Sequence, residues 1–440
     1  MSSTGDSFYC SVSFYLTKFY SYTLGMAGRL RLAATGVQDE WLTGEPQFSY
    51  FLTNFKRHSK FAFDYVESQF DGDIDFDKTI TCRVPGDKGD LVKNLTLKIT
   101  LKDPTPDSGG ANNNIWCPSV ITHLIEHADL LIGGQPIERL TGEYIYMHQQ
   151  LYNTSDDIDQ TLYFLNGHGN ILSYASGTNY TYFLELPFYF YRNPSLAIPT
   201  CALTKQVVEV RIKLRPLSEL IFGGSFAGDV AEIPKFSMDT EFVYVSPDES
   251  NFLKSRPLDY LITQVQMSKF KMKAGDNTKS VMLNFKHPVK ELFFVSQSDT
   301  AFANNYPTEF NTITNAELRF NNEVVFNRDG KFLAYEQSLN HHVNSPNSSA
   351  ITPGAPFGVA GRFGPGKFGM YSFSLKPEVY YPTGQVNMSR ISHKLFKITI
   401  EGLRDANNNV KYVDSDSETR LYAVNYNVLR INSGLAGLKF

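Results

Sequence analysis

From Tyr50 onward the sequence repeats one pattern: short runs of alternating apolar and polar residues, broken about every ten residues by Gly, Pro, Asn or Asp. Strict alternation places successive side chains on opposite faces of the chain, as in a half-buried strand. Clear examples are residues 91–101, 206–217, 394–403 and 419–431. Short strands at this spacing, separated by turn residues, predict β-sandwiches.

Two of these runs also predict which side chains face a core. In each run the apolar residues recur at alternate positions, so they are expected to share one face of a strand. The inward residues are Leu91, Leu95, Leu97, Ile99 and Leu101 in the first run, and Val208, Val210, Ile212 and Leu214 in the second.

The composition favours the same fold class. Thirty-four Phe, 25 Tyr and 2 Trp make up 14% of the 440 residues. Phe and Tyr favour the pleated, half-buried surface of strands. At roughly 100–200 residues per domain, the length predicts two or three domains. We therefore expect an all-β protein with more than one domain.

Charge and hydropathy exclude two classes of function. Lys and Arg total 41 against 45 Asp and Glu, a formal charge of −4, whereas a protein that wraps nucleic acid is expected to be basic. Direct nucleic-acid binding is therefore not predicted. A membrane-spanning helix needs roughly 18 or more consecutive apolar residues, and no stretch of the sequence approaches this length.

The cysteines indicate a reducing compartment. Cys10, Cys82, Cys117 and Cys201 lie far apart in the sequence and form no CxxC pair. This spacing argues against both a structural zinc site and a disulfide framework. We predict buried free thiols.

One helix signal lies near the middle of the chain. Ser246 as N-cap, Pro247 at the first helical position and acidic residues in the first turn predict a short helix to about Ser255. We place a linker at 246–258, between a first β domain at 26–245 and a second at 259–440. Residues 340–369, rich in Gly, Pro, Asn and Ser, are predicted to form an elaborated surface loop.

Residues 1–25 fit neither pattern. They contain seven aromatic residues with neither helical period nor strict alternation. We interpret them as an extension upstream of a second start at Met26, with an amphipathic anchor as the alternative.

The sequence HLIEH at residues 123–127 matches the H-x-x-E-H pattern of zinc proteases. Such a site needs a helix that brings both imidazoles to one side, and a distant third ligand. Here the motif runs directly into a strand pattern, so a helix could last only a turn or two. We interpret His123 and His127 as part of a strand or short turn.

Two further motifs resemble ligand loops. Residues 71–77, DGDIDFD, begin like a calcium loop, but Phe76 and Cys82 stand where the pattern needs Gly and Glu. We predict a strand there, with Ile74 and Phe76 inward. Residues 361–369, GRFGPGKFG, lack the Ser or Thr that follows the lysine of a phosphate loop. We therefore predict no catalytic residue, no metal ligand and no cofactor.

Other polar residues give weaker signals. The adjacent His341 and His342 are interpreted as part of a polar, solvated loop. Possible N-glycosylation sites in the pattern N-x-[ST] are Asn94, Asn153, Asn179, Asn347 and Asn387, which matter only if the protein enters the secretory pathway.

Several longer segments carry more information than these short motifs. They are MAGRLRLAATGVQDEWLTGEPQFSYFLTNFKRHSKFAFD (26–64), LPFYFYRNPSLAIP (186–199), SRPLDYLITQVQ (255–266), HPVKELFFV (287–295), YSFSLKPEVYYPTGQVNMSRIS (371–392) and NYNVLRINSGLAG (425–437). In this order they resemble the signature stretches of the major capsid proteins of nucleocytoplasmic large DNA viruses, the phycodnaviruses, iridoviruses and mimiviruses among them. The resemblance covers nearly all of the chain from Met26 to the C-terminus.

This resemblance implies a double jelly roll, two tandem eight-stranded antiparallel β-sandwiches, and a homotrimer with a pseudo-hexameric outline. It implies an N-terminal jelly roll with a base segment at 26–245 and a C-terminal one at 259–440. The implied partners are neighbouring capsomers, penton and minor capsid proteins and, through the N-terminal segment, the inner viral membrane. The implied location is the capsid of the virion, assembled in the host cytoplasm.

The resemblance also suggests a role for the aromatic run 188–191, which Pro187, Pro194 and Pro199 enclose. Core packing and a trimer contact are both open for its rings. Arg192 is expected to be paired if it is buried.

Two other functions stay open. A carbohydrate-binding or carbohydrate-cleaving β-sandwich is the alternative from a different class, because jelly rolls host such functions. A minor or paralogous capsomer protein, or a scaffold protein of the same fold, is the other.

Overall fold

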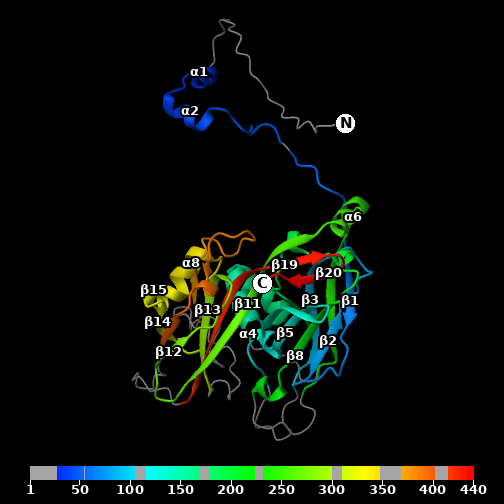
Figure 1. Ribbon diagram of the computed structural model, residues 1–440, viewed down its shortest axis with the longest axis vertical. Helices are drawn as coiled ribbons and strands as arrows, with labels where there is room; N and C mark the ends of the chain where they lie inside the picture. The colour runs from blue at the N-terminus through cyan, green and yellow to red at the C-terminus, as the bar shows by residue number, and fades with distance from the viewer. Residues whose placement is uncertain are drawn as a thin grey trace. The chain divides into compact units, whose positions relative to one another are not determined.

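The computed structural model describes residues 27–53, 55–104, 115–168, 178–222, 231–299, 310–346, 368–401 and 415–440 (Figure 1). The chain divides into one unit that ends at His58 and a second from Ser59 to Phe440. In the first unit the described helices are α1 (Ala27–Ala33) and α2 (Val37–Thr43). Residues 1–25, and Cys10 with them, lie outside the described residues.

The first sandwich consists of two four-stranded antiparallel sheets, with strand orders β1-β10-β3-β7 and β2-β8-β5-β6. A short pair of strands, β4 (Ile115–Trp116) and β9 (Ile221–Phe222), lies beside them. The eight strands are β1 (Phe61–Gln69), β2 (Thr79–Arg83), β3 (Leu91–Lys102), β5 (Ile125–Ile132), β6 (Gln135–Thr141), β7 (Asn179–Glu185), β8 (Val208–Leu214) and β10 (Lys235–Val245).

The second sandwich has the same strand orders, β11-β19-β13-β16 and β12-β18-β14-β15. Strands β17 (Val386–Asn387) and β20 (Leu435–Leu438) extend its first sheet. The main strands are β11 (Leu258–Met272), β12 (Thr278–Met282), β13 (Pro288–Ser298), β14 (Ile313–Phe320), β15 (Glu323–Asp329), β16 (Phe368–Ser372), β18 (Lys394–Ile400) and β19 (Ser417–Asn432). The predicted all-β double jelly roll is confirmed.

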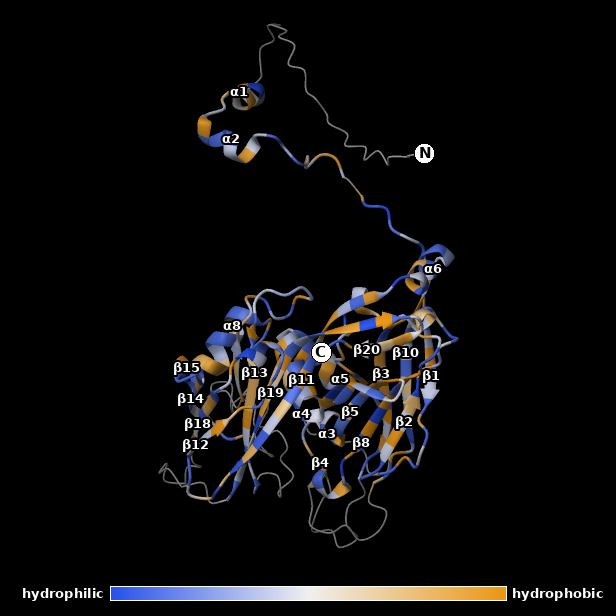
Figure 2. Cartoon of the chain, in the orientation of Figure 1, coloured by the Kyte–Doolittle hydropathy of each residue, from blue (hydrophilic) through white to orange (hydrophobic). Residues whose placement is uncertain are grey.

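The alternating runs form the predicted strands, and both sandwiches carry apolar and polar bands along them (Figure 2). In β8 the four predicted residues are buried. In β3 the prediction is wrong at the first position, because Val92 is buried and Leu91 is only half-buried. The cause is a β-bulge at Lys93, where the register with β10 shifts by one residue.

The loop 71–77 also differs from its prediction. It forms no strand but connects β1 to β2, and Asp77 has a positive φ of 59°. The inward direction of two of its side chains was nevertheless predicted correctly, since Ile74 and Phe76 lie half-buried against the core. A turn with two anchored apolar side chains has the same alternation of burial as a strand.

The predicted helix near the middle of the chain is confirmed as α6 (Pro247–Ser255), with Ser246 at the N-cap position. The sequence analysis missed α4 (Gly142–Tyr152), because nearly all of its residues are buried and it has no polar face. The remaining helical segments are α3 (Val120–Leu124), η1 (Asp157–Leu162), α5 (Tyr163–Asn166), η2 (Pro194–Leu196), η3 (Thr200–Ala202), η4 (Leu217–Glu219), η5 (Phe332–Glu336), α8 (Gln337–His341) and η6 (Met388–Arg390). Among the described helices, none has the length and apolar character needed to cross a bilayer.

Two hydrophobic clusters fill the second unit. One lies inside the second sandwich and includes Leu292, Phe294 and Leu421. The other fills the first sandwich and continues onto the opposite face of the second sandwich's sheet, through Phe293 and Tyr422. The first sandwich therefore packs on the outer face of the sheet β11-β19-β13-β16.

The two sandwiches repeat each other in local detail. The hairpin β5–β6 turns through Gly133 and Gly134, and the hairpin β14–β15 turns through Asn321 and Asn322, all four with positive φ. Each hairpin has a register shift two residues before its turn begins. The hairpins therefore correspond residue by residue, with β5–β6 followed by α4 and β14–β15 followed by η5 and α8.

A glycine follows each hairpin. At Gly142 and at Gly330 an added Cβ would overlap the carbonyl oxygen of the first residue of the neighbouring strand, Ile125 and Ile313 respectively. Only glycine lets the chain approach so closely. The two glycines give the helical segments a common starting point for counting, after which α4 continues as an α-helix and η5 as a π-helix.

A bulge marks the same place in the two large sheets. Lys93 is the extra residue of β3 against β10, and Lys290 is the extra residue of β13 against β19. Counting from these lysines, Asn94 corresponds to Glu291, and Asp239 of β10 corresponds to Tyr422 of β19.

Candidate functional site

Two polar clusters join α4 of the first sandwich to the outer face of the second sandwich's sheet. The Glu291 cluster consists of Tyr152, Lys290, Glu291, His342 and Glu378. The Arg420 cluster consists of Thr141, Glu143, Gln297, Glu418, Arg420 and Tyr422. Buried charges are tolerated only when they are paired, so these clusters determine how the two sandwiches meet.

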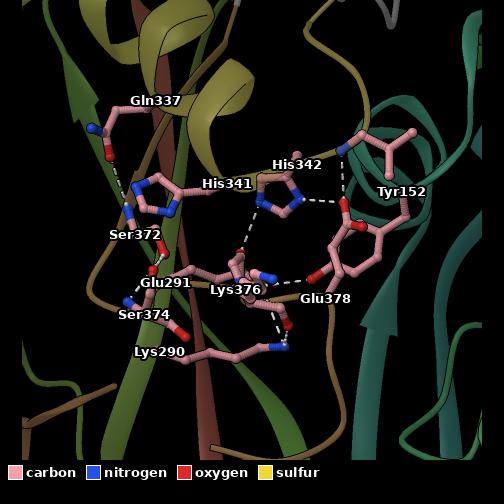
Figure 3. A network of polar contacts seen from close by, with 12 residues as sticks. Tyr152, Lys290, Glu291, Gln337, His341, His342, Ser372, Ser374, Lys376 and Glu378 are labelled. Carbon is pink, nitrogen blue, oxygen red and sulfur yellow. Dashed lines mark hydrogen bonds and ion pairs between the residues drawn. The ribbon is translucent and has the colours of Figure 1, made fainter. Parts of the chain in front are cut away.

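The Glu291 cluster connects four segments of the chain (Figure 3). His342 Nε2 lies 3.1 Å from Glu291 Oε2, and Nδ1 lies 3.0 Å from Glu378 Oε1. Tyr152, at the end of α4, donates its hydroxyl to Glu291 Oε1 at 2.8 Å. Lys290 Nζ lies 3.6 Å from the same oxygen and donates to the carbonyl of Pro377 at 2.8 Å.

This geometry defines the protonation of His342. Both ring nitrogens face carboxylate oxygens, and a carboxylate can only accept, so both nitrogens must carry a proton. Burial by itself lowers the pKa of His342, but the hydrogen bonds to Glu291 and Glu378 raise it above its ordinary value. His342 is therefore a buried cation between two anions.

Glu291 shows the matching effect. Burial alone would raise the pKa of this fully buried carboxyl, but Lys290, His342 and Tyr152 together lower it to about 2. Next to the cluster, the ring of His148 stacks on Tyr152 with centroids 4.0 Å apart, and burial lowers the pKa of His148 to about 3. One histidine of this region is thus charged and the other neutral.

The interpretation of His341 and His342 as solvated loop residues is wrong for His342. The side chain of His342 is fully buried, and His341 ends α8 with Nδ1 3.2 Å from the carbonyl oxygen of Leu375. The polar sequence around His342 matches a surface loop, and its partners Glu291 and Glu378 are distant in sequence. No local signal could have found this contact.

The Arg420 cluster lies at the start of α4. Arg420 contacts Glu143 through Nη2 at 2.5 Å and through Nε at 3.0 Å, and its Nη2 donates to Gln297 at 2.7 Å. The hydroxyl of Tyr422 donates to Glu143 at 2.9 Å and accepts from Thr141 at 3.1 Å. Burial alone would lower the pKa of Arg420, but the adjacent Glu143 carboxylate raises it.

A cavity of about 360 Å³ lies beside the Arg420 cluster. His123 and His127 both line it, His123 from the last turn of α3 and His127 from β5. His123 is buried, and its Nε2 has no hydrogen-bond partner within the described part of the chain. Burial lowers the pKa of His123, so it is neutral. The described residues contain no group of three or more His, Cys, Asp or Glu side chains placed to hold a metal ion.

The thiols that the structure describes are free, as predicted, and two of the three are buried. Cys82 and Cys117 are buried, and Cys201 is half-buried. Burial raises the pKa of Cys82 to about 12 and raises that of Cys117 further. A thiol with so high a pKa forms almost no thiolate, which is the reactive species.

The possible glycosylation sites have different environments. Asn94 donates to Glu185 from the middle of β3, and Asn153 is buried and donates to the carbonyl of Gln149. Asn179 and Asn387 are exposed. Asn347, like most of the loop 340–369 and of the motif 361–369, lies outside the described residues.

The aromatic run 188–191 belongs mainly to the core. Phe188, Tyr189 and Phe190 are buried in the cluster that fills the first sandwich. Arg192 is exposed, with a positive φ of 55°, and lies 3.7 Å from Glu185. The rings thus stabilise the sandwich itself.

The residues that join the sandwiches were not identified from the sequence. A comparison of the two halves could have indicated one of them: VKNL at 92–95 and VKEL at 289–292 share a pattern, with Glu291 in place of Asn94. A carboxylate at that position of a strand needs a cationic partner.

Two family models match the chain. Residues 49–246 match "Major capsid protein N-terminus", and residues 249–352 and 355–437 match "Large eukaryotic DNA virus major capsid protein". The major capsid protein of Pyramimonas orientalis virus is 31% identical over 427 residues, which cover 94% of this chain and 99% of the relative. That of Paramecium bursaria Chlorella virus 1 is 27% identical and covers 94% and 100%.

Solved structures share the fold. PBCV-1 VP54, fitted into a reconstruction of the virophage Sputnik, superposes with a TM-score of 0.73 at 21% identity, covering 89% of this chain and 100% of that one. The Faustovirus major capsid protein superposes with a TM-score of 0.68 at 12% identity, covering 92% and 97%.

Proposed function

The chain belongs to the family of large eukaryotic DNA virus major capsid proteins, and we propose that three copies of it close into a capsomer of pseudo-hexagonal outline. Its role is structural, in the capsid of a virion. Capsomers of this outline tile a shell beside pentons and minor capsid proteins, assembled in the host cytoplasm. We assign the chain no catalytic step and no cofactor.

One observation carries the trimer: each chain holds two sandwiches with the same strand orders. Three chains related by a threefold axis would place six similar sandwiches around that axis. A heterologous contact that closes on itself makes a discrete ring instead of a filament. Six near-equivalent outer faces then fit a hexagonal lattice.

The same family membership supports a division at α6. We propose an N-terminal extension at 1–25, a first jelly roll with a base segment at 26–245, a linker with a short helix at 246–258 and a second jelly roll at 259–440. The two family models meet between residues 246 and 249, at the start of α6.

The N-terminal unit is proposed to contact the inner viral membrane or a minor capsid protein. Leu32, Trp41, Leu42 and Phe51 expose between 80 and 96% of their surface. Large apolar side chains exposed together in one segment mark an interaction site. The chain's charge of −4 gives no support for direct contact with nucleic acid.

Relatives include a protein named "Capsid protein 1" and another named "Probable capsid protein 4", both from Acanthamoeba polyphaga mimivirus. We therefore keep a minor or paralogous role as the second candidate. Quantitative mass spectrometry of purified virions distinguishes the two, since a major protein exceeds every other shell protein in copy number.

The trimer is tested by light scattering after size exclusion of the full chain. We expect a mass about three times 49.7 kDa, and a pseudo-hexagonal outline in negative-stain images. A monomer at every concentration tested contradicts the proposal. Binding of the monomer on a glycan array would then favour the carbohydrate-binding alternative.

A further inference from the structure

The contact between the two sandwiches indicates what the uncovered surfaces bind. Within the chain, α4 lies on the outer face of the second sandwich's sheet: Glu143 contacts Arg420 and Tyr422, and the ring of Tyr144 lies 5.9 Å from that of Tyr422. The equivalent helical segment, η5 and α8, follows the equivalent hairpin. The equivalent outer face belongs to the sheet β1-β10-β3-β7.

The helical segment of the second sandwich exposes an apolar stripe. Phe332 and Tyr335 are half-buried, Leu339 exposes 78% of its surface, and Val343 exposes 56%. Phe332 and Tyr335 belong to η5 and Leu339 to α8, and Val343 follows the extended residue His342 just after the end of α8. Leu151, which corresponds to Leu339 when counted from the paired glycines, is fully buried in the cluster that fills the first sandwich.

The outer face of the first sandwich's sheet is apolar at its β1 edge. Phe61, Phe63 and Tyr65 alternate along β1 and expose 51, 50 and 69% of their surface. Their neighbours Ala62 and Asp64 point to the opposite face, because successive residues of a strand alternate. Three exposed aromatic side chains in a row mark a surface that another molecule covers.

The charges on the two surfaces are complementary at equivalent positions. Lys331 corresponds to Glu143, since each directly follows its glycine, and Asp239 corresponds to Tyr422. Glu143 bonds to Tyr422 within the chain. Neither Lys331 nor Asp239 makes an ion pair with any residue that the structure describes. Glu143 and Tyr422, which hold α4 in place, thus correspond to Lys331 and Asp239. These two are a cation and an anion on the two uncovered surfaces, without an ion-pair partner among the described residues.

We propose that the segment Phe332–Val343 of one copy docks on the outer face of the sheet β1-β10-β3-β7 of a second copy, with Lys331 paired to Asp239. The contact repeats between chains the arrangement that α4 makes within one chain. It rests on the proposed trimer and adds its surfaces and its direction, which is head to tail. Within the chain β6 lies along β11, where Gln264 donates to the carbonyl of Ile137, so in the docked pair the equivalent strand β15 lies along the aromatic edge of β1.

The test is a charge exchange in the full chain. We expect Lys331→Glu and Asp239→Lys each to raise the dissociation constant of the trimer at least tenfold, because each places like charges opposite one another. Lys331→Glu with Asp239→Lys in the same chain restores the pair in the opposite sense. We expect it to return the dissociation constant to within about threefold of the original, since the charge interaction is equivalent either way.

The matched control is Lys273→Glu with Asp276→Lys, a cation and an anion on the exposed turn between β11 and β12. This variant should dissociate like the unmodified chain. Mass photometry over a dilution series measures the dissociation constant, and circular dichroism verifies that each variant is folded. If the unmodified chain forms a trimer and neither single exchange weakens it, the proposed surfaces are wrong but the trimer is not. The same holds if the single exchanges weaken the trimer and the double exchange does not restore it. A wild-type chain that never trimerises overturns the proposed function as well.

Discussion

The outer faces of the two large sheets have the same backbone arrangement, but only one of them is covered within the chain. Both sheets have the same strand order and a bulge lysine at the same place, Lys93 in one and Lys290 in the other. One face is covered by α4 of the same chain, and the other exposes Phe61, Phe63 and Tyr65. The comparison teaches that side chains, not strand topology, decide which face closes within the chain.

The covered face is distinguished by buried charge. Glu291 and His342 have fully buried side chains, whereas the equivalent Asn94 on the other face carries no charge. Buried ion pairs add little net stability but strongly penalise a wrong partner, because an unpaired buried charge is costly. The two clusters therefore select one relative placement of the sandwiches.

The largest expected effect comes from removing the carboxylate of that cluster. Glu291→Gln leaves the buried Lys290 without its anion and His342 with only the partly exposed Glu378, and we expect a loss of about 3–5 kcal/mol in the free energy of unfolding. Urea unfolding at fixed chain concentration measures it. Glu378→Gln is the control: this partner is partly exposed, so the loss should be clearly smaller. Equal losses for the two variants would contradict the special weight given to Glu291.

A pair of equivalent leucines compares the two helical segments directly. Leu151→Ala empties a fully buried site and should cost about 2–5 kcal/mol at any chain concentration. Leu339→Ala removes an exposed side chain and should change the stability of the isolated chain by less than about 0.5 kcal/mol. Its effect should appear only where chains associate. Urea unfolding at two chain concentrations separates the two cases, and a concentration-independent loss for Leu339→Ala would show that its stripe is part of the chain's own core.

The Glu291 cluster should also make stability depend on pH. The carboxyl of Glu291 has a folded pKa of about 2 against 4.5 ordinarily, which corresponds to on the order of 3 kcal/mol. Because the folded pKa is lowered, this contribution is present above about pH 4.5 and is lost as the pH falls toward 2. The pKa of His342 is raised, so its contribution is present below about pH 6.5 and is lost as the pH rises through the raised value.

The measurement is the difference in unfolding free energy between the unmodified chain and Glu291→Gln from pH 3 to pH 9. We expect the difference to be largest between about pH 4.5 and pH 6.5 and to narrow on both sides. A difference that does not vary with pH would mean that the cluster acts through packing alone.

Substitution of the paired glycines should have the smallest effect on stability, and it tests whether the two sandwiches are equivalent after their hairpins. Gly142→Ala and Gly330→Ala each force a Cβ against a carbonyl oxygen of a neighbouring strand, and we expect about 1–3 kcal/mol for each. Thermal unfolding measures both. Gly86→Ala is the control, because an added Cβ there meets nothing within 4 Å. A large difference between the stability losses of Gly142→Ala and Gly330→Ala would mean that the two sandwiches are not equivalent at this point.

Most of the architecture could be predicted from the sequence, because alternation along a strand is a local property. The strands at 206–217 and 394–403 and the helix after Ser246 were found in this way. Helix α4 could not be found, because burial on all sides removes the amphipathic period on which such a prediction depends.

The polar clusters are a matter of long-range geometry. His342 has the local sequence of a surface loop, and its charge depends on Glu291, 51 residues away. Arg420 depends on Glu143, 277 residues away. Only the comparison of VKNL with VKEL contained a hint, since it places a carboxylate at a strand position that holds an amide in the other half.

The burial of the thiols has a consequence for a capsid that passes from reducing to oxidising surroundings. Cys82 and Cys117 are packed in the first sandwich, and the pKa of Cys82 is raised to about 12. Disulfide exchange proceeds through thiolate attack, so these sulfur atoms stay inert when the surroundings change from reducing to oxidising. The capsid of a virion can therefore meet oxidising surroundings without reaction at Cys82 and Cys117.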